Sequence, residues 1–156
     1  MNKVTSAILS AALGGVLVVG LASPSHAATS LRAKALGTAT AHKGNSYKYG
    51  AAGPSRFDCS GLVYYSYRKN GRTLPRTAQA QYNKASKVAA SARKKGDLVF
   101  IGRSGSSIYH VGIYAGFWSG YGWIIDSPKP GRTVGFHKIK DYTAGSPKAY
   151  YARYNG

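Results

Sequence analysis

The stretch Phe57-Asp58-Cys59-Ser60-Gly61-Leu62 is the one that the other segments of the chain surround as a scaffold. Cys59 is the only cysteine in the 156-residue sequence, so it forms no internal disulfide. A free cysteine is often no more than a small buried apolar residue. Its position after a glycine- and proline-containing loop, in a chain with the features of an exported protein, favours a nucleophile instead.

A helix is expected directly after this cysteine, over residues 60–70. Asp58 is a favourable N-cap residue and Gly71 a favourable stop signal. The sulfur of Cys59 therefore lies in the first turn of the predicted helix. Unpaired backbone N–H groups and the positive end of the helix dipole favour the thiolate there, and the thiolate is the nucleophilic form of cysteine.

The first residues of the chain have the pattern of a signal peptide. Lys3 precedes an uncharged, mainly apolar run from Val4 to Ala22, and Pro24 then breaks the run before small residues at Ser25 and Ala27. The run approaches the length of a membrane span, but its glycines and alanines make it only mildly hydrophobic. We predict a signal peptide over residues 1–27, one domain over residues 28–156, and a secreted, extracellular or cell-wall-associated protein.

The chain is strongly basic, with 22 Lys and Arg residues against 4 acidic residues and a formal net charge of +18. Loss of Lys3 with the leader would leave +17. So large a positive charge favours a polyanionic partner. The basic residues are scattered along the chain and do not form one block. Because a secretory signal argues against intracellular nucleic acid, we expect anionic cell-wall polymers as partners and no nucleic acid. A merely solvated basic surface is the alternative.

Helical patterns come first along the chain and strand patterns follow, which indicates the α+β class. The sheet is expected to have five mainly antiparallel strands, against which the helices pack. The expected helices cover residues 29–43, 60–70 and 78–84, and the expected strands cover residues 97–101, 109–115, 122–126, 133–137 and 149–153.

The candidate base for Cys59 is a histidine at the start or end of a predicted strand. His110 begins an apolar strand, and pairing of residues 110–115 with 122–126 would bring Asp126 close to its imidazole. A base held by a third polar group is the arrangement that activates a nucleophile. Taken singly, His110 could equally be a surface residue and Asp126 the start of the Ser127-Pro128 turn. With one cysteine, no glutamate and no metal-ligand spacing, we expect neither a metal nor a cofactor.

Five segments, taken together and in this order, resemble the NlpC-type (NlpC/p60) family of cell-wall cysteine peptidases. They are Tyr47-Lys48-Tyr49-Gly50, Phe57 to Val63, Leu74-Pro75-Arg76-Thr77 with Gln81, Lys95 to Phe100, and His110-Val111-Gly112-Ile113-Tyr114. The resemblance implies a papain-like fold and cleavage of peptidoglycan stem peptides, typically between D-γ-glutamyl and a diamino acid.

The resemblance also implies roles for single residues. Cys59 is then the nucleophile and His110 the base, while Tyr47 lies near the oxyanion. Asp58 and Ser60 match positions that often hold the free amine of the stem peptide. The third polar residue of the family is commonly a histidine, but Asp126 stands in that segment here. A carboxylate can orient an imidazole as well as a histidine does.

We therefore predict a monomeric, secreted cysteine peptidase that hydrolyses stem peptides through Cys59, His110 and Asp126. An amidase or acyltransferase using the same Cys-His pair is one alternative. The other is a secreted cationic wall-binding protein with an inactive peptidase fold, which the high charge and the 13 tyrosines would suit.

Overall fold

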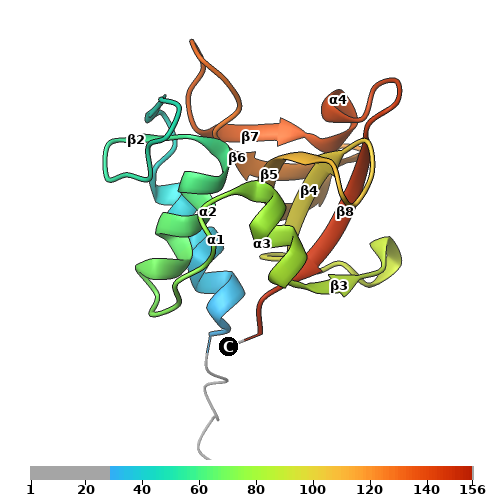
Figure 1. The fold of residues 1–156 in the computed structure, drawn as a ribbon, viewed down its shortest axis with the longest axis horizontal. Coiled ribbons are helices and arrows are strands. Elements are labelled where there is room, and N and C mark those ends of the chain that lie inside the picture. Colours follow the sequence, from blue (N-terminus) through green and yellow to red (C-terminus); the bar gives the residue numbers. More distant parts are fainter. Residues whose placement is uncertain (1–28, 156) are drawn as a thin grey trace, which may run out of the picture.

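The computed structural model describes residues 29–155, and the predicted signal peptide lies outside them. The helices α1, α2 and α3 lie on one side of a single large sheet, and α4 lies apart from them (Figure 1). α1 spans Leu31–Ala41, α2 spans Cys59–Arg68, α3 spans Ala78–Lys84 and α4 spans Ile139–Tyr142, with a 3-10 turn at Ala90–Ala92. Ser30, Asp58 and Thr77 cap α1, α2 and α3 with their side chains.

The large sheet has six strands in the order β3-β8-β4-β5-β6-β7, all antiparallel to their neighbours. Its strands are β3 (Ser86–Val88), β4 (Leu98–Gly102), β5 (Ile108–Trp118), β6 (Tyr121–Asp126), β7 (Gly135–Lys138) and β8 (Lys148–Arg153). Two short strands, β1 (Ser46–Tyr47) and β2 (Arg56–Phe57), form a separate parallel pair ahead of α2. The α+β class is confirmed.

The expectation of five strands is wrong, because β3 adds a sixth strand at the edge of the sheet. β3 has only three residues, and just one of them, Val88, is apolar. No alternating pattern marks so short a segment in the sequence. It becomes a strand because the long C-terminal strand β8 offers it a free edge, with Lys87 opposite Ala152.

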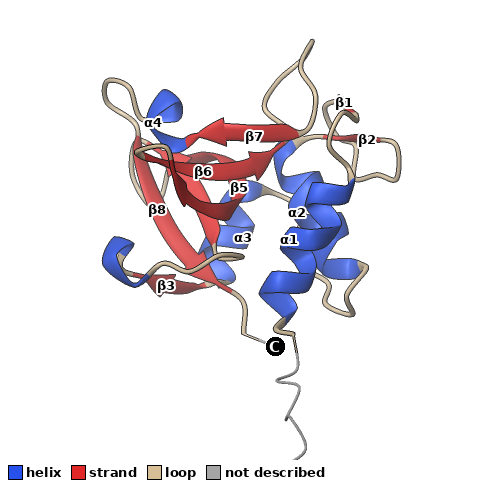
Figure 2. Cartoon of the chain, turned by 180° about the vertical axis from the view of Figure 1, so that it is seen from behind, coloured by secondary structure: helices blue, strands red, loops and turns tan. Residues whose placement is uncertain are grey.

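Figure 2 shows α1 and α2 beside the sheet and α4 apart from them, near β7. An apolar core packs on each face of the sheet. The larger core lies between the helices and the sheet, and includes Leu62, Tyr67, Phe100 and Ile113. A smaller core on the other face packs Val99, Ile101, Tyr114 and Ile124 against Ile139 of α4. Among residues 29–155, no helix is long and apolar enough to cross a membrane. The helices and the sheet together hold the start of α2 against the β5–β6–β7 side.

Candidate active site

Cys59 is the first residue of α2, and Asp58 before it caps the helix. Oδ1 of Asp58 accepts a hydrogen bond from the backbone N–H of Gly61 at 2.7 Å. Position 61 must be glycine, because the backbone of Ala51 comes so close that a Cβ atom there would lie 2.0 Å from its carbonyl oxygen. The cap and the glycine together fix the entry of the chain into α2. The backbone N–H of Cys59 is one of the first-turn donors that lack an intrahelical partner.

Arg76 holds the cap residue from the other side. Its two terminal nitrogens donate to the two carboxylate oxygens of Asp58, at 3.0 Å and 2.7 Å, and one of them also donates to Oγ of Ser60 at 2.9 Å. The hydrogen bonds to Asp58 raise the pKa of Arg76. The backbone N–H of Gly50 donates to the same carboxylate at 2.8 Å. Both oxygens of Asp58 are therefore engaged within the protein.

His110 and Asp126 meet across the β5–β6 hairpin. The Nε2–H of His110 donates to Oδ2 of Asp126 at 2.6 Å, and both side chains are buried, with 5% and 0% of the residue exposed. Gly112 makes room for this contact, because a Cβ atom there would lie 3.0 Å from Cβ of Asp126. Since Nε2 faces Asp126, the other ring nitrogen, Nδ1, is the one available to Cys59.

Two further residues complete the surroundings of Asp126. The Nδ1–H of His137 donates to Oδ1 at 2.6 Å, and the hydroxyl of Tyr142 donates to Oδ2 at 2.5 Å. The ring of Tyr142 also stacks on the imidazole of His110, with centroids 4.7 Å apart and an angle of 16° between the planes. The carboxylate thus accepts three hydrogen bonds and bridges two histidines.

The protonation of this cluster follows from its contacts. Burial alone would lower the pKa of His110, but hydrogen bonds with Asp126 and Cys59 and the charges of both raise it to about 9. Burial works against the charged form of Asp126 as well, yet the bonds from His110, His137 and Tyr142 keep the pKa of Asp126 below its ordinary value. At neutral pH the favoured state is an imidazolium beside a carboxylate.

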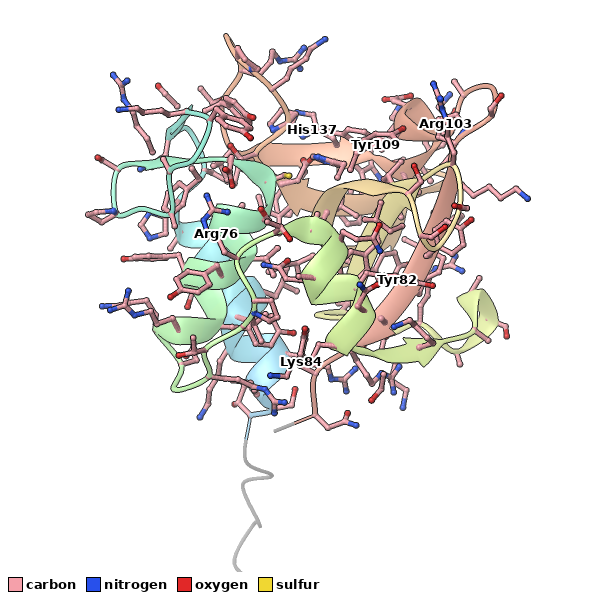
Figure 3. All side chains as sticks on the ribbon, in the orientation of Figure 1. Arg76, Tyr82, Lys84, Arg103, Tyr109 and His137 are labelled. Atoms are coloured by element: carbon pink, nitrogen blue, oxygen red, sulfur yellow. The ribbon has the colours of Figure 1, made fainter. Side chains whose placement is uncertain are left out.

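A cleft of about 480 Å³ opens over the sulfur. Tyr47 and Tyr109 line it with Cys59, and Arg76 and Gln79 form part of its wall. Figure 3 shows Arg76 beside α2 and Tyr109 toward the sheet. Burial, and to a lesser extent the charges of Cys59 and Asp58, raise the pKa of Tyr47, so its hydroxyl keeps its proton. A larger cavity of about 640 Å³ between α1 and residues 70–73 contains none of these groups.

The model of the NlpC/P60 family matches residues 44–152, which include the cleft and the His110–Asp126 hairpin. The chain belongs to the NlpC/P60 family.

Among NlpC/P60 relatives, the probable endopeptidase p60 of Listeria welshimeri is 51% identical over 75 residues. That match covers 48% of this chain and 14% of the Listeria protein. The bifunctional muramidase/DL-endopeptidase CwlT of Bacillus subtilis is 47% identical over 78 residues, which are 48% of this chain and 24% of CwlT. The chain therefore spans less than a quarter of the length of either relative.

Two solved structures of the family have the same fold. The NlpC/p60 domain of the peptidoglycan hydrolase SagA has a TM-score of 0.67 and 31% identity, over 78% of this chain and 98% of that domain. RipD of Mycobacterium tuberculosis is described as a non-catalytic NlpC/p60 domain protein adapted to peptidoglycan binding. It has a TM-score of 0.64 and 22% identity over 79% of this chain and 96% of its own, and at that identity the likeness concerns the fold alone.

The structure of this NlpC/P60 chain brings the six predicted site residues to one region. Tyr47, Asp58 and Ser60 lie around Cys59 in the cleft, and His110 and Asp126 form a buried pair whose imidazole interacts with Cys59. Sequence reasoning gave no role to Arg76 or Tyr142. Arg76 carried a signal, because it stands in one of the family-like segments. Tyr142 belongs to a four-residue helix without such a signal.

Proposed function

We propose that this protein is a secreted cysteine peptidase that hydrolyses peptidoglycan stem peptides, between D-γ-glutamyl and a diamino acid. The observation that carries the proposal is the buried His110–Asp126 contact of 2.6 Å beside a cysteine at the start of a helix, in an open cleft. Membership of the NlpC/P60 family, and relatives named as endopeptidases, support the class of substrate.

In the proposed reaction, the thiolate of Cys59 attacks the carbonyl carbon of the scissile peptide bond. The imidazolium of His110 supplies a proton to the leaving amine, and the acyl group stays on the sulfur as a thioester. Water then attacks the thioester, with His110 as the base, and the thiolate is restored. The raised pKa of His110, about 9, supports an imidazolium that is ready to act as the acid at neutral pH.

Two hydrogen-bond donors are available to the oxyanion that forms during these steps. One is the backbone N–H of Cys59, and the other is the hydroxyl of Tyr47, whose pKa is raised mainly by burial. A phenol that keeps its proton can donate to a negatively charged oxygen. These donors lie in the same cleft as the sulfur, as the chemistry requires.

The free amine of the stem peptide is proposed to bind at Asp58 and Ser60. Because Arg76 already donates to both oxygens of Asp58, an incoming ammonium group has to share the carboxylate with the guanidinium. We therefore propose Arg76 as the residue that positions Asp58 for the substrate. The same Cys-His pair would also serve an amidase or an acyltransferase, and the identity of the acyl acceptor distinguishes these reactions.

The test is digestion of purified muropeptides, with mass spectrometry of the fragments. The protein should release fragments separated at the D-γ-glutamyl bond, and Cys59→Ser and His110→Ala should each abolish release without changing the circular dichroism spectrum. Wild-type protein that binds muropeptides without cleaving them would instead support the alternative of an inactive wall-binding protein. Transfer of the acyl group to an added amine would support an acyltransferase.

A further inference from the structure

A cluster of aromatic side chains lies at the far end of the β5–β6 hairpin from His110. Ser119 and Gly120, with φ values of 50° and 78°, form the tight turn between the two strands. A β-bulge between Tyr114 and Gly116 precedes this turn, and bulges redirect the side chains that follow them. The side chains of Phe117 and Trp118 come out exposed, at 63% and 40%.

Aromatic rings from three strands lie in contact here. The rings of Trp118 and Trp123 stack with centroids 4.9 Å apart and only 3° between their planes. The ring of Phe136 on β7 meets Trp118 edge-on at 5.8 Å. Tyr121 stands opposite Trp118 in the strand register and extends the row. Large aromatic groups that gather at a surface are typical of a binding site.

Three lysines lie along this row of rings. Nζ of Lys138 is 4.2 Å from the centroid of Tyr121 and 5.5 Å from that of Trp123, and Nζ of Lys140 is 4.6 Å from the centroid of Tyr121. At the other end, Nζ of Lys43 is 5.0 Å from the centroid of Phe136. We call this set the aromatic–lysine ladder; its members are Trp118, Tyr121, Trp123, Phe136, Lys43, Lys138 and Lys140.

Within residues 29–155 none of the ladder's lysines forms a salt bridge, and Asp141, which follows Lys140 in sequence, pairs with none of them. Asp58 pairs with Arg76, Asp97 with Arg32 and Arg153, and Asp126 with His110 and His137. Three of the four acidic residues of the chain are thereby occupied elsewhere. Two ammonium groups that share one tyrosine ring repel each other, and an anion between them would relieve that repulsion.

We propose that the aromatic–lysine ladder binds an anionic glycan, a sugar polymer of the cell wall that carries phosphate groups. Trp118, which is 40% exposed, offers an apolar ring to a sugar, and the lysines over Tyr121 and Phe136 match the phosphates. The rings of Trp118 and Trp123 already cover each other's facing surfaces and leave no slot for a nucleic-acid base between them, so we favour a sugar polymer over a nucleic acid.

The ladder is distinct from the cleft. His110 is the third residue of β5 and Trp118 the last, so the two lie eight residues apart, or about 26 Å at 3.3 Å per residue. Phe136 and Lys138 flank His137 on β7, but successive side chains of a strand point to opposite faces of the sheet, so both lie on the face opposite to His137. A polymer held at the ladder would keep the protein on the wall while the cleft stays open to a stem peptide. That consequence rests on the proposed function, whereas binding by the ladder does not.

The test is co-sedimentation of the purified protein with two kinds of isolated bacterial wall. One retains its phosphodiester-linked polymers, and the other has lost them through hydrofluoric acid. Lys138→Gln with Lys140→Gln removes two charges from the ladder, and Trp118→Ala removes a ring. The matched control is Lys69→Gln with Lys84→Gln, which removes two charges at the ends of α2 and α3; Lys84 is labelled in Figure 3. Cleavage of a small soluble muropeptide is measured in parallel.

Each ladder variant should bind intact walls about tenfold more weakly, while the control changes less than about twofold. Wild-type binding should fall to a similar extent on the stripped walls, and muropeptide cleavage should not change in any variant. Thermal unfolding checks that the variants fold. Equal losses in ladder and control variants would overturn the proposal, as would equal binding to both kinds of wall. Displacement from intact walls by single-stranded RNA at an equal phosphate concentration would assign the ladder to nucleic acid instead.

Discussion

Replacing Asp126 by Asn should slow hydrolysis about 10- to 100-fold and leave the domain folded. The amide has nearly the shape of the carboxylate, and its oxygen can accept from His110 Nε2 and Tyr142. Its NH₂ group can donate to Nδ1 of His137, provided that this ring carries its proton on the other nitrogen. The contacts are therefore largely kept, and the variant isolates the loss of one buried negative charge.

The size of the effect follows from the pKa of His110. That pKa is about 9, against an ordinary value of 6.5, and the interval corresponds to about 3 kcal/mol in favour of the imidazolium. Asp126 supplies the larger part of the increase and Cys59 the rest. Losing the share of Asp126 alone therefore costs about 2 kcal/mol, which lies within the expected 10- to 100-fold range.

The assay is kcat/KM on one purified muropeptide, combined with an NMR titration of His110 in the same variant. The pKa of His110 should fall in Asp126→Asn, and the alkaline limit of activity should move to lower pH with it. Asp126→Ala is the contrasting variant, because it leaves three donors without an acceptor and should lower the free energy of unfolding as well. Wild-type kinetics and an unchanged pKa of His110 in Asp126→Asn would refute the orienting role of Asp126.

Three further predictions concern pH, the cap of α2 and processing. The pKa of His110 is raised from 6.5 to about 9, so its contribution to stability should be complete below pH 6.5. That contribution and the activity should both disappear as pH rises through about 9. Urea unfolding across this pH range checks the stability, and kcat/KM checks the activity. Arg76→Gln removes the two-pronged contact with Asp58 and should lower the free energy of unfolding by about 1–3 kcal/mol, as well as kcat/KM; an unchanged unfolding midpoint would contradict the role of the pair. If residues 1–27 are a signal peptide, N-terminal sequencing of exported protein should begin at Ala28, and export with Lys3 still attached would disprove the cleavage.

Much of the fold could be read from the sequence because its signals are local. Asp58 and Thr77 cap helices with their own side chains, and the apolar strands β4, β5 and β6 lie close to the predicted ranges. The strand β3 could not be found in this way, because its three residues depend on the edge of β8, about 60 residues further along the chain.

The residues of the candidate site likewise fall into those with a local sequence signal and those whose role depends on tertiary packing. Cys59 and His110 stand in segments with clear sequence signals, and the hairpin pairing was enough to bring Asp126 near His110. Tyr142 was out of reach, because its role depends on how α4 folds back over the sheet to stack on His110. The ion pair of Arg76 with Asp58, across 18 residues, likewise arises from tertiary packing alone.

If Cys59 is a nucleophile activated by the His110–Asp126 pair, its rate of alkylation by iodoacetamide reports that activation directly. As the only cysteine in the chain, Cys59 gives an unambiguous signal in intact mass spectrometry. Rates are measured from pH 5 to pH 10 in the wild type and in His110→Ala. We predict fast labelling of the wild type already at neutral pH, and slow labelling of His110→Ala until the solution becomes alkaline. Equal rates for the two proteins at every pH would contradict the account.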